Sequence, residues 1–139
     1  MCKVSFYKSV TEQVGKSIEL EKVLNLIKNG RYQKMITSSR DALKSGNTNS
    51  YKSIKSKLPA FTVSAQFNDK RRVDEVSEYN QLLILDFDNV PKGKDWLLAD
   101  KHIKDCEYTY AYFTSPSGNG FKIIVLSLIH ISEPTRQEA

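Results

Sequence analysis

The sequence LLILDFDN, residues 82–89, joins an apolar run to a pair of acids. Four apolar residues in succession predict a strand buried on both faces. Side chains alternate along a strand, so we expect Asp86 and Asp88 to point the same way. Two carboxylates there favour a cationic partner, and Mg²⁺ or Mn²⁺ suits such oxygen ligands. The stretch therefore predicts metal-dependent chemistry on phosphates; the alternative is an acid pair capping a turn in which Asn89 makes an Asx turn.

A second stretch, TSPSGNGFK at residues 114–122, predicts a hairpin turn followed by a return strand. Ser115, Ser117 and Gly118 would offer hydroxyl and backbone N–H groups to phosphate oxygens. Lys122, on the return strand, would add a positive charge. Together with the two acids, this turn resembles a nucleoside triphosphate site. The alternative is an ordinary hairpin loop, because Asn-Gly is a common turn sequence.

A third group of residues is basic and lies in the middle of the chain. Lys70, Arg71 and Arg72 follow one another in a predicted loop, and a short lysine-rich helix is predicted upstream at residues 50–57. Because the formal net charge is +5, contact with nucleic-acid phosphates is a reasonable interpretation. The alternative is a solvated surface, which is the commoner role of basic clusters.

Hydrophobic periodicity and turn signals predict an α+β domain with a mixed sheet. Ser17 is expected to cap the first helix, and Asn29-Gly30 to end it. Trp96, Leu97 and Ile103 are expected to face inward from a later helix. The expected strands are residues 3–10, 60–67, 82–88, 108–114 and 121–125, and the expected helices are residues 17–28, 31–44, 50–57 and 95–104.

Length and composition fit one ordinary globular domain of 139 residues. Cys2 and Cys106 form no metal-binding or redox spacing, so they are interpreted as reduced thiols of a cytoplasmic protein. The first residues lack the apolar stretch of a signal peptide, and no run has the length of a membrane span. The sequence therefore predicts a cytoplasmic protein without a membrane partner.

Residues 126–139 differ in character from the strand that precedes them. This tail resembles the conceptual translation of a transposase-type sequencing adapter. We therefore expect the native domain to occupy residues 1–125, the tail to be non-native, and the genuine reading frame to continue past Val125.

Four stretches together resemble the VirE N-terminal-type domain of mobile-element proteins, which is related to the archaeo-eukaryotic primase and primase-polymerase superfamily. They are residues 4–8, 58–62, 85–89 and 115–122. The resemblance implies an RRM-like core with a mixed or antiparallel sheet and an N-terminal helical segment. It matches Asp86 and Asp88 to the first metal-binding motif and Ser117 to a phosphate-contacting serine. Lys122 departs from the histidine of many primases, and the third acid would follow Val125, so the fragment is expected to be inactive.

The function that this resemblance implies is nucleotidyl transfer for DNA priming in a bacterial mobile element or phage. The expected partners are nucleoside triphosphates, a single-stranded DNA template and a helicase domain downstream in the parent protein. Two alternatives stay open. One is a nucleic-acid-binding replication module without catalysis, which the departure at Lys122 favours. The other is a phosphatase of the haloacid dehalogenase type, in which Asp86 would be the nucleophile and Asp88 the general acid or base.

Overall fold

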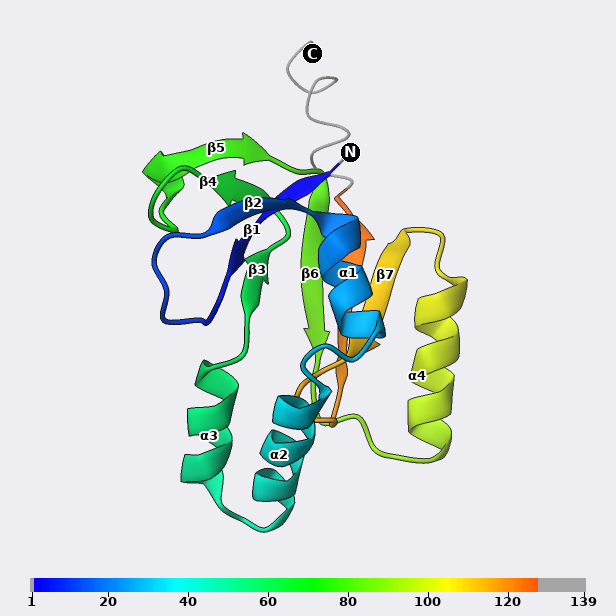
Figure 1. Cartoon of the computed structure of the whole chain (residues 1–139). Helices are drawn as coiled ribbons and strands as arrows, with labels where there is room; N and C mark the ends of the chain where they lie inside the picture. Colours follow the sequence, from blue (N-terminus) through cyan, green and yellow to red (C-terminus); the bar gives the residue numbers. More distant parts are fainter. Residues whose placement is uncertain (1, 128–139) are drawn as a thin grey trace. The chain divides into compact units, whose positions relative to one another are not determined.

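A computed structural model describes residues 2–127 of the chain (Figure 1). The chain divides into two compact units, residues 1–80 and residues 81–139, which we call unit 1 and unit 2. The last strand reaches Leu126, one residue beyond the predicted end of the native domain. Residues 128–139 of the predicted non-native tail lie outside the described residues, so that assignment stays a prediction.

Unit 1 combines two small antiparallel sheets with three helices. The first sheet has the order β2-β1-β3, and the second pairs β4 with β5. Its centre is marked by Val4, Tyr7, Leu20 and Val23, each at most 2% exposed. The elements are β1 (Lys3–Tyr7), β2 (Lys16–Glu19), α1 (Leu20–Lys28), α2 (Gln33–Lys44), α3 (Thr48–Ser56), β3 (Ala60–Thr62), β4 (Ala65–Phe67), a 3₁₀ turn (Val73–Glu75) and β5 (Val76–Tyr79).

The start of α1 differs from the sequence prediction. Ser17 lies within β2, opposite Ser5 of β1, and therefore does not cap a helix. The helix begins at Leu20, directly after the strand, with Glu19 at the N-cap position. Pairing with β1 outweighs the capping preference of serine because the ladder satisfies the backbone groups of this segment.

The end of α1 confirms the sequence prediction. Gly30 has a φ of 72°, and its N–H donates to the carbonyl of Ile27. The N–H of Arg31 donates to the carbonyl of Leu26. These two hydrogen bonds form a Schellman motif, which places glycine where a left-handed backbone is required.

The single strand predicted at residues 60–67 is two strands in the structure. β3 pairs with β1, whereas β4 pairs with β5 in a separate sheet. The alternating pattern correctly predicted extended backbone. The strand is interrupted between Thr62 and Ala65, however, and the residues on either side pair with different strands. β5 was not predicted, because only Val76 and Tyr79 give its four residues an apolar pattern.

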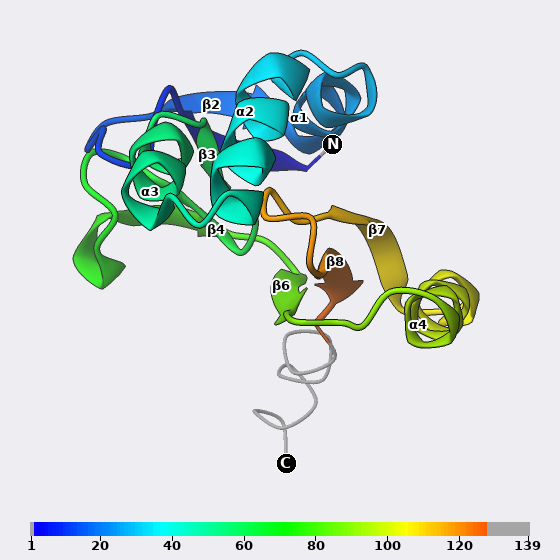
Figure 2. The same cartoon turned by 90° about the horizontal axis from the view of Figure 1, so that it is seen from below.

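Unit 2 is a three-stranded antiparallel sheet with one helix. The order β6-β8-β7 places β8 between two mutually parallel strands, which α4 connects (Figures 1 and 2). The core consists of Ile103, Phe121 and Ile123, with Trp96 and Tyr112 packed against it. Leu97 is 69% exposed, so its predicted inward orientation is wrong. The elements are β6 (Leu82–Phe87), α4 (Lys94–Asp105), β7 (Thr109–Thr114) and β8 (Phe121–Leu126).

Residues 82–87 form a strand, as predicted, but the prediction that this strand is buried on both faces is wrong. Leu82 is buried, but Leu83, Leu85 and Phe87 are 36%, 43% and 45% exposed. The three share the face of the sheet that carries Phe121 and Ile123, because they pair with or alternate beside them. Among the strands, α4 makes its main contact with β7, so it covers the β7 side of that face, while the β6 side stays more exposed.

The α+β class is therefore confirmed, in the form of four helices and three antiparallel sheets within residues 2–127. The predicted mixed sheet is not present in these residues, because every strand pair is antiparallel. An RRM-like primase-polymerase core is not established by these elements. In the described part of the chain, no helix is both long and apolar enough to span a bilayer.

Candidate functional site

The candidate site begins with an ion pair between the central strand of unit 2, β8, and its neighbour β6. Asp86 of β6 and Lys122 of β8 are direct register partners, so their side chains leave the same face of the sheet. Lys122 Nζ donates to Asp86 Oδ1 at 2.9 Å. The side chains are 31% exposed for Lys122 and 52% exposed for Asp86. Sequence reasoning named both residues, and the fold brings them into contact in a position that solutes can reach.

The turn between β7 and β8 holds the predicted serines. The hydroxyl groups of Ser115 and Ser117 lie 3.1 Å apart, and Ser117 Oγ accepts a hydrogen bond from the N–H of Asn119. The N–H of Gly118 donates to the carbonyl of Ser115, and Gly118 has a φ of 79°. Ser115 is only 5% exposed. Ser115 therefore supports the turn from inside, while Ser117 is the more accessible of the two hydroxyls.

Backbone contacts hold this turn against the end of β6. The N–H of Val90 donates to the carbonyl of Asn119. A Cβ added to Gly120 would lie 1.8 Å from the carbonyl oxygen of Phe87, so only glycine fits at this position. The acid-bearing strand end and the serine-bearing turn are therefore in contact, as the sequence analysis required of a shared site.

One residue of this region was not named from the sequence. The Nζ of Lys92 donates to the carbonyl of Gly118 and lies 3.5 Å from the ring centroid of Trp96. Trp96 in turn packs on Phe121, with ring centroids 4.3 Å apart. A lysine in this position carries no local signal for the bond to Gly118, because that bond depends on where the fold places the turn between β7 and β8.

Asp88 follows the last residue of β6, and Asn89 then adopts a φ of 56°. The strand therefore ends before Asp88. Because side chains alternate only within a strand, the expectation that Asp88 points the same way as Asp86 no longer follows. Within residues 2–127, no group of three or more His, Cys, Asp or Glu side chains could hold a metal ion. Asp86 and Asp88 offer carboxylate oxygens, and Mg²⁺ is commonly held by one or two carboxylates with substrate phosphates completing its shell. Asp86 and Asp88 are donors of this kind, and Asp86 already has Lys122 as its partner.

Lys70, Arg71 and Arg72 lie in unit 1, and the two arginines have partners within that unit. Arg71 donates to the carbonyls of Val10 and Glu12, at 2.8 and 3.2 Å, and its guanidinium lies 4.5 Å from the centroid of the Tyr7 ring. Arg72 pairs with Asp74, and this hydrogen bond holds the pKa of the Asp74 carboxyl below its usual value. Lys70 is exposed. The assignment of Lys70, Arg71 and Arg72 to nucleic acid stays a prediction.

Comparison with known families gives one match. The family described as BT4734-like, N-terminal domain, matches residues 53–138, which is more than half of the chain. The chain therefore belongs to this family. The match begins within α3 and includes all the elements of unit 2. No curated protein matches the chain. No solved structure matches it either.

This finding corrects the resemblance drawn from the sequence. The matching family is a different one from the VirE N-terminal-type domain, so that assignment is wrong, and nothing supports membership of the primase superfamily. The four stretches that carried the resemblance are short. An apolar strand ending in Asp-x-Asp and a Ser/Gly-rich turn satisfy local strand and turn preferences in many folds, and they do not identify a family.

Proposed function

We propose that unit 2 binds the phosphate groups of a nucleoside triphosphate together with Mg²⁺ or Mn²⁺, for nucleotidyl transfer in DNA replication. The observation that carries the proposal is the ion pair between Lys122 and Asp86, whose side chains are both partly exposed. It places one anionic and one cationic group side by side. Such a pair can receive a cation and the phosphate that accompanies it.

The turn between β7 and β8 supports the same proposal. Ser117 is partly exposed, and the contact of Gly120 with Phe87 fixes the turn beside the acidic strand end. Preorganised donors bind a charged group without the cost of ordering a flexible loop. In the proposed site, Ser117, Gly118 and Lys122 contact phosphate oxygens, whereas Asp86 and Asp88 hold the cation. A bound divalent cation would neutralise phosphate charge and activate the attacking 3′-hydroxyl.

Nucleotide binding by the 139-residue chain tests this function directly. Calorimetric titration with dATP is expected to give binding that requires Mg²⁺ or Mn²⁺ and disappears in EDTA. Asp86→Asn and Lys122→Met should each weaken binding by about tenfold or more, because each removes a charge-assisted contact. Asp105→Asn, at the end of α4, is the matched control and should bind as the parent does. Equal binding by all four proteins, or no binding by the parent, would reject the proposal.

A second candidate is binding of nucleic acid without catalysis. Asp86 already has a cationic partner in Lys122, so the site does not need a metal ion to balance its charge. This function predicts binding of single-stranded DNA that is unaffected by EDTA and occurs without nucleotide incorporation. The phosphatase alternative predicts instead a trapped aspartyl-phosphate on Asp86. The proposal also includes a cytoplasmic location and a helicase domain downstream in the full-length protein.

A further inference from the structure

The positive charge of this chain is concentrated in a helical hairpin of unit 1. Residues 29–59 contain seven basic side chains and one acidic side chain, Asp41. The rest of the chain contains fourteen basic and fifteen acidic residues, so it is nearly neutral. The net charge of +5 therefore arises from α2, α3 and the segments that flank them, which we call the α2–α3 hairpin.

Five lysines of this hairpin carry a charge that no ion pair offsets in the described part of the chain. Lys34, Lys44, Lys52, Lys55 and Lys57 are exposed, and within residues 2–127 none of the five forms an ion pair. α4 provides a contrast, because it carries three lysines and three aspartates along its length. Mixed charge is typical of a solvated helix, whereas a set of uncompensated lysines creates a positive potential that attracts polyanions.

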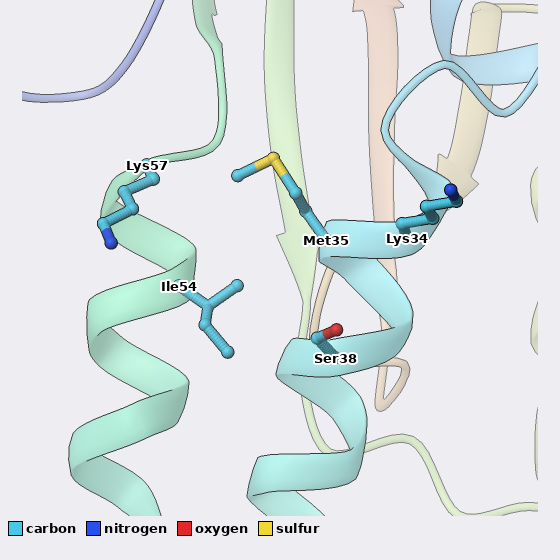
Figure 3. Close-up of a pocket in the computed structure, with 5 residues that line it drawn as sticks. All are labelled: Lys34, Met35, Ser38, Ile54 and Lys57. Atoms are coloured by element: carbon cyan, nitrogen blue, oxygen red, sulfur yellow. The ribbon is translucent and has the colours of Figure 1, made fainter.

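A groove runs between the two helices of the hairpin. It has a volume of about 320 Å³ and is lined by Lys34, Met35, Ser38, Ile54 and Lys57. In Figure 3, the side chains of Met35 and Ile54 extend into the space between α2 and α3, while the amino groups of Lys34 and Lys57 are directed outward on either side. The groove therefore has an apolar floor with a cationic group at each side.

We infer that the α2–α3 hairpin binds single-stranded nucleic acid. An unpaired strand offers apolar base faces and a chain of phosphates, and this groove offers an apolar surface between Lys34 and Lys57. A duplex hides its base faces, so it would use the lysines but not Met35 and Ile54. This surface differs from Lys70–Arg72, where Arg71 and Arg72 already have partners within unit 1. The inference does not depend on the proposed metal site.

Fluorescence anisotropy of a labelled 20-nucleotide oligo-dT, titrated with the 139-residue chain in EDTA, tests the inference separately from nucleotide binding. The double variant Lys34→Gln/Lys57→Gln is expected to weaken binding by about tenfold and to reduce the slope of log K against log salt by about 0.7 for each lysine removed. Lys101→Gln/Lys104→Gln on α4 removes the same charge and is expected to retain the affinity and the slope of the parent.

A third variant tests the apolar floor. Met35→Gln keeps the length of the side chain and should weaken binding of oligo-dT without changing the salt slope, because no phosphate contact is lost. Circular dichroism establishes that each variant is folded. Equal losses in the α2–α3 and α4 double variants would overturn the inference. So would equal affinity for a duplex of the same length, or binding to vesicles of anionic lipid in preference to oligo-dT.

Discussion

Lys122 Nζ lies 2.9 Å from Asp86 Oδ1, across a register pair that joins β8 to β6. Both side chains are partly exposed, so water screens their attraction and the pair contributes little to stability. Stability alone therefore gives the fold little reason to keep the two charges in contact.

A double-mutant cycle on this pair measures that contribution. Asp86→Asn, Lys122→Met and the double variant are expected to give a coupling energy of about 0.2–1 kcal/mol in urea unfolding, because partly exposed ion pairs fall in this range. Trp96, the one tryptophan of the chain, lies in α4 and reports unfolding of unit 2. A coupling well above this range would show that the pair is structural, and it would weaken the case for a binding role.

The Gly120 contact predicts strong intolerance to a side chain. Gly120→Ala places a methyl group against the carbonyl of Phe87, so the turn or the strand end has to move. We expect a loss of about 1–3 kcal/mol of unfolding free energy, as for other overpacked sites. Asn119→Ala, at the exposed neighbouring position, is the control and should change stability by less. If the two variants were equally stable, the close packing of turn and strand would not exist in solution.

The hydrogen bond between Tyr112 and Asp100 predicts a dependence on alkaline pH. The Tyr112 hydroxyl donates to Asp100 Oδ1 at 2.9 Å, and this bond to the carboxylate, with partial burial, raises the pKa of the phenol. A raised folded-state pKa contributes stability that is fully present below the ordinary tyrosine pKa of about 10. That contribution is lost as the pH rises through the folded-state pKa.

Urea unfolding of the parent and of Tyr112→Phe at two pH values tests this linkage. At pH 8 the variant should be less stable by about 1 kcal/mol, because it lacks the hydrogen bond between α4 and β7. Above the raised pKa the difference should shrink, since the ionised phenolate no longer donates. A difference that stays constant from neutral to alkaline pH would contradict the linkage.

Arg71 is expected to hold the segment between β1 and β2 in place. It bonds the carbonyls of Val10 and Glu12 and stacks on Tyr7, so Arg71→Met removes two hydrogen bonds and a cation–π contact. Amide hydrogen exchange of residues 8–15 should become about tenfold faster. Lys70→Met is the matched control. Unchanged exchange in both variants would leave Arg71 available for the nucleic-acid role that the sequence suggested.

Local sequence signals predicted the local features of the fold. Asn29-Gly30 ended α1 as expected, and residues 82–87 formed a strand, as the shortness of the apolar run predicted. The burial of that strand could not be predicted, because it depends on α4 packing over β7. The same holds for Ser17, where pairing with a distant strand overrode the capping preference.

The part of the candidate site that could be predicted consists of residues in two short sequence motifs. Asp86, Ser117 and Lys122 were named from sequence, and register pairing between β6 and β8 explains why the first and last of these meet. Lys92 escaped notice because the residue it bonds, Gly118, lies 26 positions further along the sequence. The family was misjudged because short motifs report local conformation rather than ancestry.

The strand order of unit 2 has a consequence for synthesis on the ribosome. β6 pairs with β8 and not with β7, so residues 82–87 are made before their partner at residues 121–126. Without that partner, β6 carries exposed leucines and an open backbone edge, a state that invites association with other chains. A chain released after the Ser/Gly turn, before β8 is made, would therefore be prone to aggregate, and pairing with β8 is the step that protects β6.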